Sequence, residues 1–412
     1  MSGRRVALGR ALGIVAAVIL AVGPAGAGDD LWTRGELTGE WGGARPKLAD
    51  RGIGLDLDFT GFGVGFLSGT GEEAFEASGR GDAFLTFDAG KLGLWKGGRL
   101  STHFEYRGGE LPPSGGALWP ASTGTFLPLD ARDELVMSTF HFSQTLGRAT
   151  LIVGKINVVD RLAGDPFFGG WGTRRFMNVA LVAPPSGLLP PVIMGAIATY
   201  AARPWSLTAM VYDPNDRTRD YFPGDLFDDG VNLSLAGAWS GAWGGRPSNL
   251  ALSGTYSTRE GTDLSDVLLP PDLEAGTKAG SWSLGIQGGH LLVPSPALPG
   301  RGLGVYLRAL LADGNPNPIR AGVMGGFAGQ GVVPGRERDT FGVGYYYYAF
   351  SDALQSSVSP VVPFEDEQGL EVYYSLAATP WFRLTADLQV VNPASGASRT
   401  AVTGAVRANV VF

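Results

Sequence analysis

Cysteine is absent from the 412-residue chain, and histidine occurs only three times. The lack of cysteine excludes a disulfide scaffold, thiol catalysis and thiolate-ligated metal. Beyond the N-terminus, no run approaches the roughly 18 uncharged apolar residues that a membrane-spanning helix needs. Acidic residues outnumber basic ones by 39 to 32, and no basic stripe of the kind that binds nucleic acid is present. We therefore expect neither a helical membrane protein nor a nucleic-acid-binding protein.

The N-terminus has the pattern of a secretory signal peptide. Arginines precede an apolar core at residues 11–22, and a small-residue cleavage site ends at Ala27. We expect residues 1–27 to be cleaved during export. Residues 28–52 follow as a periplasmic N-terminal segment with a short helix, because Pro46 fits a first helical turn.

An alternation of apolar and polar residues begins at Ile53. Leu55 and Leu57 lie on one side of the predicted strand, and Asp56 and Asp58 lie on the other, because successive side chains of a strand point in opposite directions. Comparable segments recur to the end of the chain. The predicted strands are 53–67, 80–91, 98–108, 132–144, 149–158, 191–202, 205–213, 230–241, 248–257, 280–291, 302–312, 319–329, 339–350, 367–378, 382–392 and 401–412.

The connections between these strands are broadly long and short in turn. Residues 109–131 and 258–279 are long connections, whereas Arg203-Pro204 is a tight one. Outer-membrane barrels sort their loops in this way, and a soluble sandwich has no reason to do so. We therefore predict an all-β fold, a transmembrane antiparallel β-barrel of about 16 strands over residues 53–412. A barrel of this size encloses a water-filled lumen, which makes a channel the expected function.

One long connection differs from the others in composition. Residues 154–191 hold Phe167, Phe168, Trp171 and Phe176 among charges, glycines and prolines. Loops of this length are functional or disordered, and this one has too many aromatic residues for disorder. We predict that it folds into the lumen as a constriction loop.

Three segments carry a family resemblance: LTGEWGGARPKLADRGIGLDLDFTG at 37–61, GKINVVDRLAGDPFFGGWGTRRFMN at 154–178 and LEVYYSLAATPWFRLTADLQVVNP at 370–393. Together they resemble the carbohydrate-selective porins of the OprB type. The resemblance implies a sixteen-strand barrel in the outer membrane of a Gram-negative bacterium. It also implies a charged constriction that passes monosaccharides, glucose foremost, by passive facilitated diffusion. The loop at 109–131 matches no part of the pattern, so the preferred sugar stays open.

Charged and aromatic side chains that face the lumen are the candidates for a sugar path. They offer bidentate hydrogen bonds to hydroxyls and flat faces for C–H groups. Arg107 beside Glu105 is the foremost pair, and replacing Arg107 by alanine is expected to weaken sugar block of the ion current. The other candidates are Asp56, Asp58, Asp160, Arg161, Asp165, Trp171, Arg174 and Arg175.

A structural role stands beside the functional one for each candidate. Asp160 and Arg161 are equally consistent with a pair that holds the loop against the wall. For Trp171 the flanking glycines favour a packed anchor, with a stacking platform as the alternative. Of Arg174 and Arg175, one is expected to fix the loop and the other to face the path.

Other functions remain open at this point. A general porin for small polar solutes fits the same barrel, and a soluble lectin-like protein would show the same alternation. A barrel hydrolase would use His103 or His141 with a nearby serine, but no strained nucleophile turn accompanies them. We expect no enzyme activity, cofactor or metal, and we expect a monosaccharide and outer-membrane lipid as partners. The protein is a monomer or a homo-oligomer.

Overall fold

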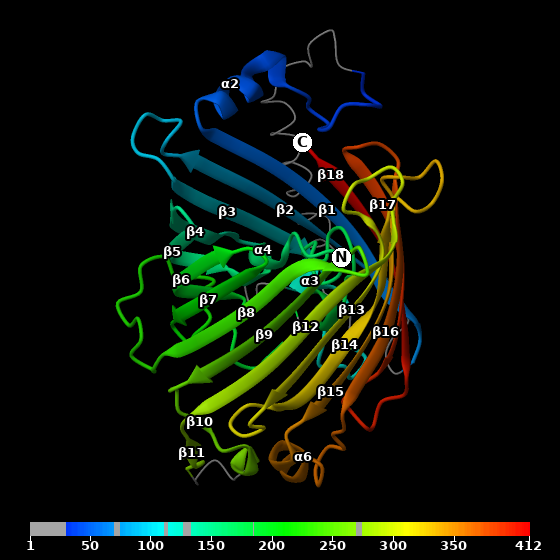
Figure 1. Cartoon of the computed structure of the whole chain (residues 1–412). Coiled ribbons are helices and arrows are strands. Elements are labelled where there is room, and N and C mark those ends of the chain that lie inside the picture. Colours follow the sequence, from blue (N-terminus) through cyan, green and yellow to red (C-terminus); the bar gives the residue numbers. More distant parts are fainter. Residues whose placement is uncertain (1–29, 70–74, 111–113, 127–132, 184, 269–273) are drawn as a thin grey trace.

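The computed structural model describes residues 30–412 except 70–74, 111–113, 127–132, 184 and 269–273. The predicted signal peptide at 1–27 lies outside the described residues. Sixteen antiparallel strands close into one barrel, in which the first strand pairs with the last (Figure 1). The predicted fold class and strand number are confirmed.

The barrel strands agree with the predicted segments to within a few residues. They are β1 (Ile53–Ser68), β2 (Phe75–Asp88), β3 (Gly98–Gly109), β4 (Leu135–Leu146), β5 (Ala149–Asn157), β6 (Val192–Ala202), β7 (Trp205–Tyr212), β8 (Asn232–Trp243), β9 (Arg246–Ser257), β12 (Ser281–Pro294), β13 (Gly302–Ala312), β14 (Ile319–Gln330), β15 (Thr340–Phe350), β16 (Glu367–Ala377), β17 (Phe382–Asn392) and β18 (Ala401–Val411). The largest shift is in β2, which begins five residues before the predicted 80 because Phe75 to Gly79 continue the pairing with β1.

Short elements lie outside the barrel wall or in its connections. β10 (Gly261–Thr262) and β11 (Thr277–Lys278) form a separate two-stranded sheet. The helices are η1 (Trp41–Gly43), α2 (Ala44–Asp50), α3 (Thr123–Phe126), α4 (Val158–Leu162), α5 (Val179–Val182), η2 (Leu264–Asp266) and α6 (Asp352–Val358). Among the described residues, no helix is both long enough and apolar enough to cross a membrane.

The two ends of the barrel differ in their connections. The turn end carries tight turns such as Gly244-Gly245, where both residues have positive φ angles that glycine adopts without strain. The loop end carries the long connections, including α6 and the β10–β11 sheet. In Figure 1 the N-terminal α2 and the C-terminus lie together at the turn end, opposite α6. An even number of strands produces this arrangement.

The N-terminal segment is fastened to the seam where β1 meets β18. The Leu37 amide donates to the Val411 carbonyl at 2.8 Å, and Arg45 Nη2 donates to the Phe412 carbonyl at 2.6 Å. Trp381 Nε1 donates to the Leu31 carbonyl at 2.8 Å. The first two bonds add hydrogen-bond partners at the end of β18 to those that its neighbouring strands supply. The third holds the segment to the turn between β16 and β17.

The outer surface of the barrel is apolar where the strands face outward. Leu233, Leu235, Leu250 and Leu252 are 45–57% exposed on neighbouring strands. In water such a band is unfavourable, but it matches the hydrocarbon layer around a membrane barrel. The polar residues that alternate with them therefore face the interior.

An ion cluster organises the connection between β7 and β8. Arg217 Nη2 lies 2.9 Å from Asp213 Oδ2, and the same guanidinium reaches Asp220 and Asp225 at 3.0 Å. Burial alone would raise the pKa of Asp213, but hydrogen bonds from Arg217 and from the backbone amides of Phe227 and Asn215 lower it below its ordinary value of 3.8. A depressed carboxyl pKa stabilises the folded loop above the unfolded pKa.

We predict that this loop keeps its order on acidification until the pH falls below about 3.8, the ordinary pKa of the Asp213 carboxyl. The stabilisation is lost as the pH falls further, through the folded pKa. Replacing Arg217 by glutamine should remove this acid resistance, so that the loop opens at higher pH. Hydrogen exchange of residues 213–231 across a pH series measures the effect. Equal pH profiles for wild type and Arg217→Gln would contradict the prediction.

Candidate functional site

The connection from β5 to β6 enters the barrel and fills part of it, as predicted. Phe167, Phe168 and Phe176 are at most 1% exposed, and they form one core with inward side chains of β13 to β16. Glycines make room for this core. A Cβ atom at Gly342 would lie 2.7 Å from the Phe176 ring, and one at Gly344 would lie 2.7 Å from Leu181. The two glycines therefore leave β15 without side chains at the positions where the infolded segment packs against it.

Backbone hydrogen bonds to wall side chains fix the far part of this segment. The Glu371 carboxylate on β16 accepts from the Met177 and Asn178 amides, the latter at 3.0 Å. Asn178 donates to Gln389 at 3.1 Å, and Arg407 donates to the Gly172 carbonyl at 2.7 Å. Three strands of the wall thus hold residues 172–178.

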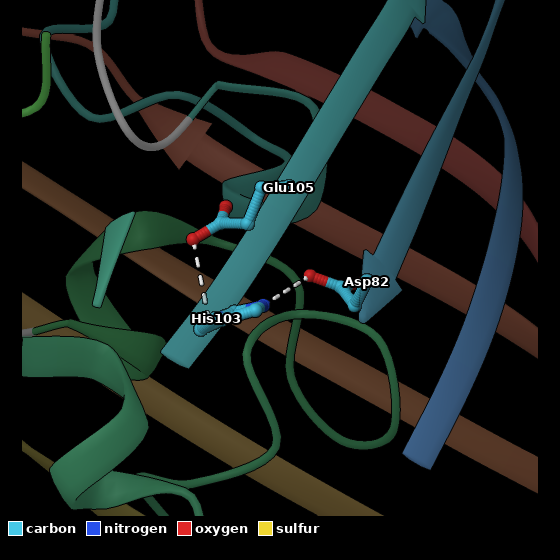
Figure 2. A group of neighbouring side chains, drawn as sticks. All are labelled: Asp82, His103 and Glu105. Atoms are coloured by element: carbon cyan, nitrogen blue, oxygen red, sulfur yellow. Dashed lines mark hydrogen bonds and ion pairs between the residues drawn. The ribbon is translucent and has the colours of Figure 1, made fainter. Parts of the chain in front are cut away.

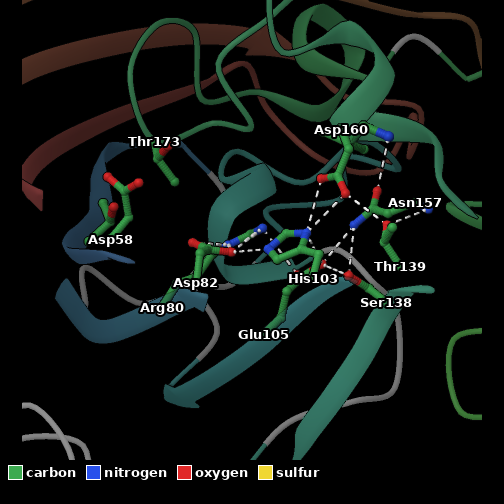
Figure 3. A network of polar contacts seen from close by, with 12 residues as sticks. Asp58, Arg80, Asp82, His103, Glu105, Ser138, Thr139, Asn157, Asp160 and Thr173 are labelled. Carbon is green, nitrogen blue, oxygen red and sulfur yellow. Dashed lines mark hydrogen bonds and ion pairs between the residues drawn. The ribbon is translucent and has the colours of Figure 1, made fainter. Parts of the chain in front are cut away.

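A buried polar network lies on the part of the wall formed by β2 and β3 (Figure 3). Arg80 contacts Asp82 at 2.7 Å and Glu105 at 3.1 Å. His103 Nε2 lies 2.9 Å from Asp82, and His103 Nδ1 lies 3.0 Å from Asp160 on α4. The side chains of Arg80, Asp82, His103 and Glu105 are at most 5% exposed. The network joins the start of the infolded segment to the wall.

Neighbouring groups complete this network. Asn157 Nδ2 donates to Glu105 at 2.7 Å, Ser138 also donates to Glu105, and Thr139 donates to Asp160 at 2.8 Å. Asn157 Oδ1 in turn caps α4 by accepting from the Val159 amide. The side-chain oxygen therefore starts the helix that positions Asp160.

Figure 2 shows the three members of this network that have metal-ligating atoms, Asp82, His103 and Glu105. Their ligand atoms lie within 4.8 Å of one another. The Arg80 guanidinium already pairs with both carboxylates, and a cation in the same space would meet its positive charge. The group fits a closed ion-pair network better than a metal centre.

The residues predicted for the pore fall into different surroundings. Arg107 and Glu105 are 1% and 0% exposed, and Glu105 pairs with Arg80 and lies 3.5 Å from His103 Nδ1. Asp160 bonds to His103 and Thr139, and no ion pair joins it to Arg161 among the described residues. Asp56 and Arg161 are exposed.

The remaining candidates lie along the infolded segment. Arg174 is 41% exposed at its side chain and pairs with Asp58 at 2.9 Å. Arg175 donates to the backbone carbonyl of Asp165. The Trp171 ring stacks on Phe84 with centroids 5.2 Å apart, which fits a packed anchor. The structure thus brings four of the predicted residues into contact in ways that the sequence analysis did not predict, Asp58 with Arg174 and the Asp165 carbonyl with Arg175.

The sequence analysis missed Arg80 and Asp82, which sit two residues apart on β2. Their spacing in Gly79-Arg80-Gly81-Asp82 puts both charges on the inward face, and that pattern could have identified them. It also missed Gln287 and Arg308, because polar residues in β12 and β13 are isolated and only the pairing of the two strands puts them opposite each other.

Two cavities beside the infolded segment share no lining residue. The turn-end cavity has a volume of about 650 Å³ and reaches the Arg203-Pro204 turn; Arg175, Tyr306 and Tyr373 line it. The loop-end cavity has a volume of about 690 Å³ and reaches Pro318. One cavity thus lies towards the turn end of the barrel and the other towards the loop end.

Comparison with solved structures identifies the same architecture. A Pseudomonas putida OprB structure described as the high-pH form superposes with a TM-score of 0.81 at 16% identity, over 93% of this chain and 100% of that one. The low-pH form gives a TM-score of 0.60 at 15% identity, over 92% and 99% of the two chains. A loop-deletion mutant of Vibrio cholerae OmpT, an outer membrane protein, gives 0.50 at 12% identity, over 88% and 100%.

At these identities the structures establish the fold alone. A search of curated protein sequences found no match. The family model described as carbohydrate-selective porin, OprB family, matches residues 72–412, which is most of the chain and all but the first strand of the barrel. The protein belongs to the OprB family of carbohydrate-selective porins of the outer membrane.

Proposed function

We propose that this carbohydrate porin passes neutral monosaccharides, glucose-like in size, by passive diffusion. The observation that carries the proposal is the pair of cavities left beside the infolded segment. Volumes of about 300 to 1,000 Å³ hold drug-sized ligands, so each cavity has room for one hexose and its water. Hydroxyls find charged and amide groups there, and sugar C–H faces find aromatic rings.

Tyr306 is the best-placed stacking surface in the turn-end cavity. Its ring is half-buried and stacks on Phe167, with centroids 5.4 Å apart and planes 27° apart. Arg175 and Arg301 line the same cavity and supply hydrogen-bond donors. A sugar on the free part of the ring would meet both kinds of contact.

We predict that Tyr306→Leu weakens glucose block of the ion current by up to about tenfold, because an aromatic contact contributes about 0.5 to 1.5 kcal/mol. Tyr306→Phe keeps the ring and should keep the block. The measurement is single-channel conductance in planar bilayers, titrated with glucose and a disaccharide. A wild-type pore whose current no sugar reduces would replace the proposal by a general porin for small polar solutes.

Among the residues predicted from the sequence, we propose that Asp165 and Arg175 face the path and that Arg107 and Glu105 belong to the wall. The burial of Arg107 and Glu105 supports this division. Arg107→Ala is then expected to act through the stability of the wall rather than through contact with sugar. Asp58 and Arg174 form an ion pair that stays a candidate for the path.

We infer that the protein is a channel without catalytic activity. Both ring nitrogens of His103 contact carboxylates, so this histidine has no serine partner of the kind a hydrolase uses. Ser248 lies 2.8 Å from His290 Nδ1, but no carboxylate orients that histidine within the described ranges. We also propose that residues 28–52 are periplasmic and that the outward leucines contact lipid.

A further inference from the structure

Three side chains between the two cavities, Asp165, Gln287 and Arg308, form one hydrogen-bonded chain. Gln287 Nε2 donates to Asp165 Oδ2 at 3.0 Å, and Arg308 Nε donates to Gln287 Oε1 at 2.8 Å. We call this chain the bridge. It joins the infolded segment to the wall at β12 and β13.

The bridge lies at the level where the lining changes from one cavity to the other. On β12, Gln287 lines the loop-end cavity and Gly289 lines the turn-end cavity. On β13, Arg308 lines the loop-end cavity and Tyr306 lines the turn-end cavity. A solute that moves between the cavities therefore passes these side chains.

The two carboxylate oxygens of Asp165 have different partners. Oδ1 accepts from the Phe167 and Phe168 amides at 2.8 and 2.7 Å, which fixes the turn of the infolded segment. Oδ2 accepts the hydrogen bond from Gln287 Nε2. The Arg308 guanidinium lies over the Phe168 ring at 4.3 Å, so both ends of the bridge are held in place.

Asp165, Gln287 and Arg308 are half-buried, unlike the Arg80 network, so solvent reaches them. A hydroxyl both donates and accepts hydrogen bonds. It can therefore replace the Gln287 amide at Asp165 and accept from Arg308 in the same position. A solute without hydroxyls would leave both charges unpaired, which is costly in a narrow site.

We propose that the bridge is the selectivity gate of this pore and that it opens by exchanging the Gln287 contacts for the hydroxyls of a polyhydroxylated solute. This inference deepens the proposed function, since it names the residues that separate a sugar from other small solutes. Gln287 is the residue that determines specificity, because its bond to Asp165 is the part of the bridge that must break.

The test uses Gln287→Met, which keeps the length of the side chain and removes its hydrogen bonds. The substitution removes the hydrogen bond from Gln287 to the Asp165 carboxylate, which holds the gate closed. The ratio of open to closed pores should therefore rise by about tenfold. Ion conductance in planar bilayers should increase, and liposome swelling should discriminate less between glucose and deoxy sugars. Gln287→Glu replaces the donating amide by a carboxylate, which cannot donate to Asp165, and should also open the pore.

Gln368→Met is the matched control, since Gln368 is exposed on β16 and lines neither cavity. Heat-dependent gel migration confirms that each variant is folded. If both Gln287 variants conduct and discriminate like wild type and like Gln368→Met, the gate is wrong. A wild-type pore without sugar block, combined with higher ion conductance in Gln287→Met, would keep the gate and overturn the monosaccharide function.

Discussion

Replacing Glu371 by alanine is expected to release the infolded segment and to produce a wider, less selective pore. Glu371 is 1% exposed and is the acceptor for two consecutive backbone amides of the segment. Each amide left without a partner costs about 1 to 3 kcal/mol. Single-channel conductance should rise, and a disaccharide that wild type excludes should enter in a liposome-swelling assay.

Two comparison variants sharpen this experiment. Glu371→Gln keeps one acceptor oxygen and should lie between wild type and Glu371→Ala. Glu365→Ala removes an exposed carboxylate near the loop end of the same strand and should behave like wild type. Unchanged conductance in a folded Glu371→Ala barrel would show that the aromatic core alone holds the segment.

Replacing Arg80 by methionine is expected to produce the largest loss of barrel stability. Its guanidinium is the shared partner of Asp82 and Glu105, and all three side chains are at most 5% exposed. Breaking a buried pair by removing one partner costs about 3 to 5 kcal/mol, because a buried charge stays uncompensated. Urea unfolding in detergent, followed by heat-dependent gel migration, measures the loss.

The control for this experiment is an exposed ion pair. Arg320 and Asp352 lie 3.2 Å apart with side chains 48% and 70% exposed, so Arg320→Met should cost at most about 1 kcal/mol. Arg80→Lys retains the charge but not the bidentate contact and should be intermediate. Equal unfolding curves for Arg80→Met and Arg320→Met would mean that water or His103 compensates the two carboxylates.

The barrel was predictable because its signals are local. A strand shows its two faces as a period of two, and this pattern was readable at Leu55 to Asp58 without any partner strand. The lengths of the connections then distinguished the loop end of the barrel from the turn end, and the number of strands predicted the size of the lumen. The infolded segment was predictable for a similar reason, since its aromatic residues need a core and no other core was available in a barrel.

The individual site residues were predictable only in part. Arg107 and Glu105 were predicted on one inward face of β3 with both side chains in the sugar path. In the structure both side chains are buried, and Glu105 pairs with Arg80 on the neighbouring strand. Exposure depends on what the infolded segment covers, and no pattern within β3 contains that information.

The sequence by itself determined the strands, their faces, the sorted loops and the presence of a segment that must enter the lumen. These follow from the chemistry of residues close together along the chain. Only the tertiary structure decided which polar groups meet, as Asp165 of the infolded segment meets Gln287 of the wall and Gln287 meets Arg308 on the next strand. The first contact joins residues 122 positions apart and depends on where the infolded segment comes to rest, and the second depends on strand register.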